Sequence, residues 1–131
     1  MRSRLALPAV AAALLVLVAC TGDDPAALYQ LPPTKECLQK SDLRLSDKPP
    51  DFVASTATGG ALRVRFADIR LTLLFGEDEA EAGRLDRAYR RFVQKGLPID
   101  DVLKRDRNVV ELWEFAPTID HQDTLNRCLR S

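Results

Sequence analysis

The chain has 131 residues, 46% of them hydrophobic, and its 19 basic and 19 acidic side chains leave it without net charge at pH 7. A chain of this length can form one small domain with a single buried core. Its charge balance gives no electrostatic basis for general nucleic-acid binding, which usually involves a strongly basic domain. We therefore expect no nucleic acid among its partners.

The N-terminus has the features of an export signal. A short cationic stretch with Arg2 and Arg4 precedes an apolar run over residues 5–18. Such a run has the usual length of a signal-peptide core and is shorter than the ~20 apolar residues that span a bilayer. The tetrapeptide LVAC, which ends at Cys20, resembles the lipobox of bacterial lipoproteins. In a lipobox the cysteine thiol accepts a diacylglycerol, and a peptidase cuts directly before this cysteine.

This resemblance concerns only the first 21 residues, and it implies a cellular location but no activity. Residues 1–19 would be a lipoprotein signal peptide, and Cys20 would carry the lipid. The mature protein would then be lipid-anchored to the cell membrane on its extracytoplasmic side, with the membrane as its first partner. An ordinary secretory leader with a chance cysteine is the alternative. Loss of residues 1–19 removes two arginines and no acid, so the mature chain would be slightly acidic.

Domain organisation follows from composition. Residues 20–33 contain two adjacent aspartates and three prolines and lack a sustained apolar period, so we interpret them as a flexible tether. Residues 34–131 are predicted to form a single α+β globular domain.

The first half of this domain reads as a short helix followed by strands. Thr34 is placed to cap a helix over residues 35–41, a brief strand is predicted over 43–45, and residues 52–57 are predicted to be extended. The clearest signal is a hairpin that bends at residues 67 and 68, because apolar residues alternate on both sides of the bend. The inward residues of this hairpin are Leu62, Val64, Phe66, Ile69, Leu71, Leu73 and Phe75.

The second half alternates helices with one further strand. A helix over residues 78–95, a helical turn or two near 99–103, a strand over 109–115 and a last helix capped by Thr118 are predicted. The inner face of the long helix is assigned to Ala82, Leu85, Tyr89, Phe92 and Val93. The predicted fold is therefore α+β, with a small antiparallel sheet of three to four strands and helices packed on one face.

The cysteines predict a covalent link between the ends of the domain. With Cys20 lipidated, Cys37 and Cys128 remain as a pair in an oxidising compartment, where a disulfide is the usual state. It would join the N- and C-terminal helices. The alternative is a metal site formed by both cysteines and His121, the only histidine. Structural zinc requires four ligands, so we expect no metal and no other cofactor.

A candidate binding site follows from the hairpin. Arg63, Arg65 and Arg70 should share one sheet face, and guanidinium groups bind oxyanions such as phosphates, anionic wall polymer or lipid headgroups. The sequence favours a second interpretation, in which this is the solvated face of a one-sided antiparallel sheet and Glu111 or Glu114 pairs with the arginines.

Two single residues complete the candidates. Trp113, the only tryptophan, is a core residue by default, but if exposed it would be the best binding anchor in the chain. His121 has no serine or cysteine nucleophile beside it in the sequence, so we assign no catalytic residue.

The sequence therefore predicts a non-enzymatic binding or structural module of the cell envelope, with an envelope protein or an anionic polymer as partner. A small envelope hydrolase or hydrolase inhibitor is the alternative. A deep polar pocket containing His121 would favour an enzyme, whereas an arginine face or an exposed apolar patch near Trp113 would favour binding.

Overall fold

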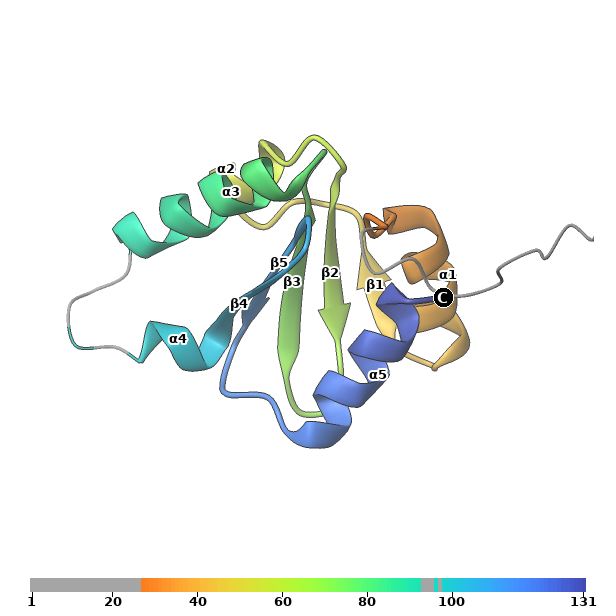
Figure 1. The fold of residues 1–131 in the computed structure, drawn as a ribbon. Helices are drawn as coiled ribbons and strands as arrows, with labels where there is room; N and C mark the ends of the chain where they lie inside the picture. Colours follow the sequence, from red (N-terminus) through yellow and green to blue (C-terminus); the bar gives the residue numbers. More distant parts are fainter. Residues whose placement is uncertain (1–26, 93–95, 97) are drawn as a thin grey trace, which may run out of the picture.

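A computed structural model describes residues 27–92, 96 and 98–131. Five antiparallel strands form one sheet in the order β1-β2-β3-β5-β4, so the α+β class is confirmed while the predicted three to four strands are too few. The strands are β1 (Arg44–Ser46), β2 (Ala61–Arg65), β3 (Arg70–Phe75), β4 (Leu103–Asp106) and β5 (Val109–Trp113). The helices are α1 (Leu31–Lys40), α2 (Phe52–Ser55), α3 (Glu79–Phe92), α4 (Ile99–Val102) and α5 (Ile119–Leu129) (Figure 1).

The predicted signal peptide, Cys20 and the first part of the predicted tether lie outside the described residues. In the part of the chain that is described, no helix combines the length and the apolar character needed to cross a bilayer.

The β2–β3 hairpin forms as the alternation predicts. Leu62 lies opposite Leu73 and Val64 opposite Leu71, and the backbone N–H of Phe66 donates to the carbonyl oxygen of Ile69 at 2.9 Å to close the turn. All seven inward residues that the sequence predicts for this hairpin belong to one buried cluster.

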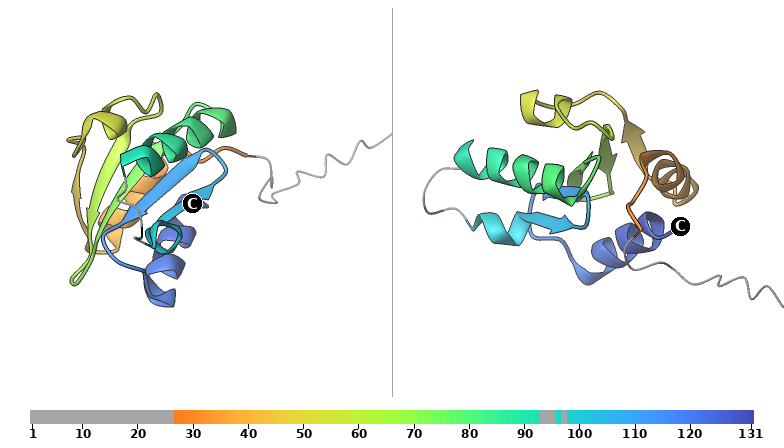
Figure 2. Two further views of the ribbon diagram at one scale, coloured as in Figure 1. Left: turned by 90° about the vertical axis from the view of Figure 1, so that its left-hand side faces the viewer. Right: turned by 45° about the horizontal axis from the view of Figure 1, so that its top comes forward.

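Helices cover both faces of the sheet, so the prediction that they pack on one face is wrong (Figure 2). One face, here called the closed face, packs against α1 and α5 through residues such as Leu38 and Leu125. The other, here called the open face, packs in part against α2 and α3 through residues such as Val53 and Leu85. The physical reason lies in β3 and β5, which carry buried residues on both faces. On the open face these residues include Leu74 and Val110.

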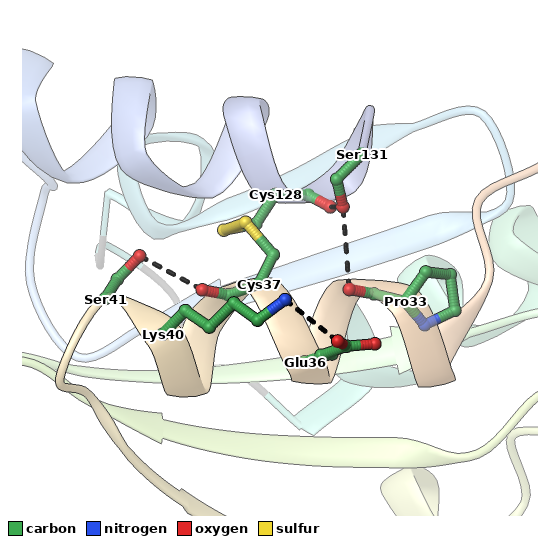
Figure 3. A network of polar contacts seen from close by, with 7 residues as sticks. All are labelled: Pro33, Glu36, Cys37, Lys40, Ser41, Cys128 and Ser131. Atoms are coloured by element: carbon green, nitrogen blue, oxygen red, sulfur yellow. Dashed lines mark hydrogen bonds and ion pairs between the residues drawn. A yellow bond between two sulfur atoms is a disulfide. The ribbon is translucent and has the colours of Figure 1, made fainter.

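A disulfide between Cys37 and Cys128 joins α1 to α5, as predicted, with Cα atoms 5.2 Å apart across 91 residues of sequence. The metal site proposed as an alternative for these two cysteines is therefore wrong, because their sulfur atoms are bonded to each other. Figure 3 shows the disulfide beside a second link, in which the Ser131 hydroxyl donates to the carbonyl oxygen of Pro33 at 3.5 Å. The first and last helices thus form one covalently closed layer on the closed face.

The folded unit begins before the boundary predicted at residue 34. Helix α1 starts at Leu31, since prolines are tolerated in a first helical turn, where backbone N–H groups need no helical partner. Thr34 does not cap the helix, because its buried hydroxyl donates to the carbonyl oxygen of Gln30 at 2.7 Å. Tyr29 is buried in the core. Residues 29–33 therefore belong to the domain and not to the tether.

A buried amide holds this N-terminal segment in place. The Asn108 side chain accepts a hydrogen bond from the backbone N–H of Tyr29 at 2.8 Å and donates to the carbonyl oxygens of Tyr29 and Gly76 at 2.9 Å each. The Tyr29 hydroxyl also donates to Asp106 at 2.9 Å. This set of contacts, here called the Tyr29 clamp, fixes the segment against the turn between β4 and β5.

Three local predictions differ from the structure. Residues 52–55 form helix α2 instead of an extended segment, because the Asp51 carboxylate accepts a hydrogen bond from the Ala54 N–H at 2.8 Å and caps a helical turn. Strand β4 was not predicted, since its edge position needs little apolar sequence. Phe92, assigned to the inner face of α3, is 78% exposed; Val93 lies outside the described residues.

Candidate functional site

A hollow of about 600 Å³ lies on the open face. Residues of β1, β2 and β3 line it, together with Pro50 and residues 112–114. The charged residues among those that line it are four arginines and one glutamate: Arg44, Arg63, Arg65, Arg70 and Glu114. We call this hollow the arginine trough.

Strand register explains why the arginines gather. Arg44 in β1 is the direct cross-strand partner of Arg65 in β2, and Arg65 is in turn the partner of Arg70 in β3. Directly opposite residues have Cβ atoms roughly 5 Å apart. The three arginines therefore form a row that runs across the strands, with Arg63 one pleat further along β2 on the same face.

Glu114 ends this row. Its carboxylate accepts hydrogen bonds from the Arg70 guanidinium, from Nε at 3.1 Å and from Nη2 at 2.5 Å, and from the backbone N–H of Arg70 at 3.2 Å. The hydrogen bond with Arg70 lowers the pKa of the Glu114 carboxyl and raises that of the Arg70 guanidinium. Both groups are therefore charged at neutral pH.

The other three arginines have no such partner. Within the described residues, no carboxylate oxygen lies within the 4.0 Å of a salt bridge from Arg44, Arg63 or Arg65, and all three side chains are exposed. Like charges directly opposite each other on neighbouring strands are destabilising. Glu114 offsets part of this repulsion through its ion pair with Arg70 and its electrostatic attraction to Arg65, and an anionic ligand would offset more of it.

The sequence placed part of this site correctly. Arg63, Arg65 and Arg70 share one face, as the hairpin predicts, and Glu114 is the neighbouring acid. Arg44 was missed, because its place beside Arg65 depends on the β1–β2 register across a proline-containing connection.

Trp113 is not a binding anchor. It borders the trough, but its side chain is 2% exposed and belongs to the core of the closed face. Its indole N–H donates to the Glu111 carboxylate at 2.9 Å, and Gln122 donates to the same oxygen at 3.3 Å. Glu111 therefore lies on the opposite face from the arginines, and the expectation that it neighbours them is wrong.

Burial governs the ionisation of Glu111. The side chain is inaccessible to solvent, and this burial raises its pKa above the ordinary value, while the hydrogen bonds from Trp113 and Gln122 act in the opposite direction. It is a structural carboxylate under the last helix.

Structural contacts account for the position of His121, and no catalytic role is needed to explain it. Its Nδ1 accepts a hydrogen bond from the Thr118 N–H at 3.2 Å and so completes the N-terminal cap of α5. Its Nε2 lies 3.0 Å from Asp68 at the tip of the β2–β3 hairpin, and its ring packs edge-on against Phe66 with centroids 5.0 Å apart. Within the described residues, the imidazole forms hydrogen bonds with the Thr118 backbone N–H and the Asp68 carboxylate.

His121 also lies away from the two cavities described here. It lines neither the arginine trough nor a smaller hollow of about 290 Å³ beside Tyr29. Across residues 27–92, 96 and 98–131, no group of three or more histidine, cysteine or acidic side chains is arranged to hold a metal ion.

No protein-family model, no curated protein and no solved structure matches the chain.

Proposed function

We propose that this protein is a non-enzymatic binding module of the cell envelope that holds an anionic polymer in the arginine trough. The observation that carries the proposal is the row of arginines across β1, β2 and β3, in which like charges lie directly opposite each other. A ligand with several negative charges relieves this repulsion, and guanidinium groups supply paired donors that match oxyanions.

The shape of the site favours a polymer over a flat charged surface. The arginines lie in a hollow, and the row crosses three strands. A linear chain of anionic groups can enter the hollow and meet several arginines in succession.

The proposed location rests on the sequence. The resemblance of LVAC at Cys20 to a lipobox supports a lipid anchor on the extracytoplasmic side of the cell membrane. In that compartment the domain would keep an anionic wall polymer close to the membrane.

A binding titration tests this function. The purified protein is titrated with long-chain inorganic polyphosphate, and the same titration is made with a triple variant, Arg44→Gln/Arg63→Gln/Arg65→Gln. Arg70 is left in place because it holds Glu114. We expect the triple variant to lose most of the affinity for the polymer. The slope of log affinity against log salt concentration should also become shallower by about 0.7 for each lost contact.

The matched control removes the same charge elsewhere. Arg84, Arg87 and Arg91 are exposed on α3, and their triple glutamine variant should keep nearly the wild-type affinity and salt dependence. Equal losses of affinity in both triple variants would mean that binding depends on net charge alone and not on the arginine trough. Failure of the wild type to bind any polyanion at low salt would refute the function.

Anionic vesicles form a second arm of the test. If the wild type binds vesicles rich in anionic lipid more tightly than the polymer, and through the same three arginines, the membrane surface replaces the polymer as the ligand.

A further inference from the structure

Glu114 occupies the place that a ligand oxyanion would take at one end of the arginine row. Both of its carboxylate oxygens accept hydrogen bonds from the Arg70 guanidinium, and one of them also accepts from the Arg70 backbone N–H. This two-point fit of a carboxylate to a guanidinium is the geometry by which arginine binds carboxylate and phosphate ligands. The protein therefore carries its own anion in the trough.

The neighbouring positions are not filled in this way. Arg65 lies directly opposite Arg70 on the adjoining strand, and among the described residues neither Arg65 nor Arg44 has a carboxylate at salt-bridge distance. Among the described residues, Arg70 is thus the arginine of the row whose guanidinium is held by a carboxylate, while Glu114 attracts Arg65 only at longer range.

We propose that Glu114 is an internal competitor that makes the trough selective for linear phosphate polymers over single phosphate ions. This rests on the proposed function and names the residue that sets its specificity. A tethered carboxylate has an effective concentration that a dilute single anion does not match. A polymer already held by Arg44 and Arg65 presents its next phosphate at a comparable effective concentration and so displaces Glu114.

Phosphate has an advantage over carboxylate in this exchange. The two oxygens of a carboxylate lie in one plane and are both used by a single guanidinium fork. The free oxygens of a phosphate point in different directions, so one phosphate can bridge the guanidinium groups of Arg65 and Arg70. A phosphate that replaces Glu114 can thus bind Arg70 and Arg65 together, which offsets the loss of the hydrogen bond from the Arg70 backbone N–H to Glu114.

Release of Glu114 leaves no buried charge behind. Its side chain is 29% exposed while it is paired, and in the described part of the chain its side-chain hydrogen bonds all come from Arg70. The freed carboxylate can turn toward water.

The test compares wild type with Glu114→Gln, using inorganic orthophosphate and long-chain polyphosphate as probes. We expect the variant to bind orthophosphate roughly two- to five-fold more tightly, which is the range of a solvent-exposed ion pair, and to gain less for the polymer. Glu79→Gln, which removes an exposed carboxylate at the start of α3, is the charge-matched control and should change neither affinity.

A second readout follows the displacement itself. In NMR spectra of the arginine Nε–H groups, the Arg70 signal should move when wild type binds polyphosphate and should stay in place at orthophosphate concentrations that shift Arg44 or Arg65. An Arg70 signal that stays in place with the polymer, or unchanged affinities in Glu114→Gln, would overturn the competitor role.

These outcomes separate the two proposals. If wild type binds polyphosphate and the triple arginine variant does not, yet Glu114→Gln behaves as wild type, only the competitor role fails. If neither wild type nor Glu114→Gln binds either probe, the proposed function fails with it.

Discussion

The two faces of the sheet are formed by the same strands but differ in the character of their side chains. On the closed face the inward residues are apolar along the full length of β2 and β3, and two helices joined by a disulfide cover them. On the open face each strand changes character along its length. In β3 the residues on this face run from Arg70 through Thr72 to Leu74, and only the apolar end is packed against helices. The closed face is therefore a packed core layer, and the uncovered half of the open face carries charged residues.

Removal of the disulfide should give the largest effect and would test the role of the closed face. In the chain-entropy account, a crosslink across 91 residues restricts the unfolded chain, and loss of a native disulfide from a small domain costs about 2–5 kcal/mol. We expect Cys37→Ser/Cys128→Ser to lose an amount in this range in urea denaturation. Ser41→Ala, which removes only a hydroxyl bonded to the carbonyl oxygen of Cys37, should lose far less. Equal stability of the double variant and wild type would show that the helix layer needs no crosslink.

Glu111 is an acidic residue buried on the otherwise apolar closed face. It should make the free energy of unfolding depend on pH, with a smaller effect than loss of the disulfide. Burial raises its pKa in the folded protein, so its favourable contribution is complete below its unfolded pKa of about 4.5 and is lost as the pH rises through the folded pKa. The free energy of unfolding of wild type relative to Glu111→Gln should therefore fall between pH 4 and pH 7. Glu79→Gln, at an exposed site, serves as the control in the same denaturation series. A difference that stays constant over this range would contradict the burial argument.

The smallest expected effect concerns the open face. Here a substitution should increase the free energy of unfolding, whereas loss of the disulfide should decrease it. Arg65 lies opposite Arg44 on one side and Arg70 on the other. Arg65→Gln should therefore raise the free energy of unfolding slightly at low salt, and the gain should shrink as salt screens the charges. Arg87→Gln on α3 is the control and should give no comparable gain. A destabilised Arg65→Gln protein would mean that the arginine row contributes to folding and is not held at a cost for binding.

Much of the closed face could be predicted from sequence, because alternation with a period of two fixes which residues of a hairpin share a face. The same rule placed Arg63, Arg65 and Arg70 together. It could not place Arg44, since nothing in the local sequence fixes how β1 pairs with β2 across the intervening turn and helix α2. The row of opposed charges is therefore a product of long-range register.

The sequence also contains a pattern that indicates the second helix layer. The runs Leu73-Leu74-Phe75 and Val109-Val110 place apolar residues on successive positions, which is typical of strands buried on both faces. Those runs mark the part of the open face that α3 covers. Where the run gives way to Thr72 and Arg70, the cover ends and the trough begins.

The Tyr29 clamp has a mechanical consequence. Any pull exerted through the residues that precede Ala27 enters the fold at the β4–β5 turn, where Arg107 donates to the Ala27 carbonyl oxygen at 2.8 Å and Asn108 holds Tyr29. From there the load passes along α1 to Cys37 and through a covalent bond into α5. Arg70 and Glu114 lie at the other end of β3 and β5. If the protein is tethered as proposed, tension would thus be borne mainly by the clamp and the crosslinked helices, and less of it would reach the end of the sheet that carries Arg70 and Glu114.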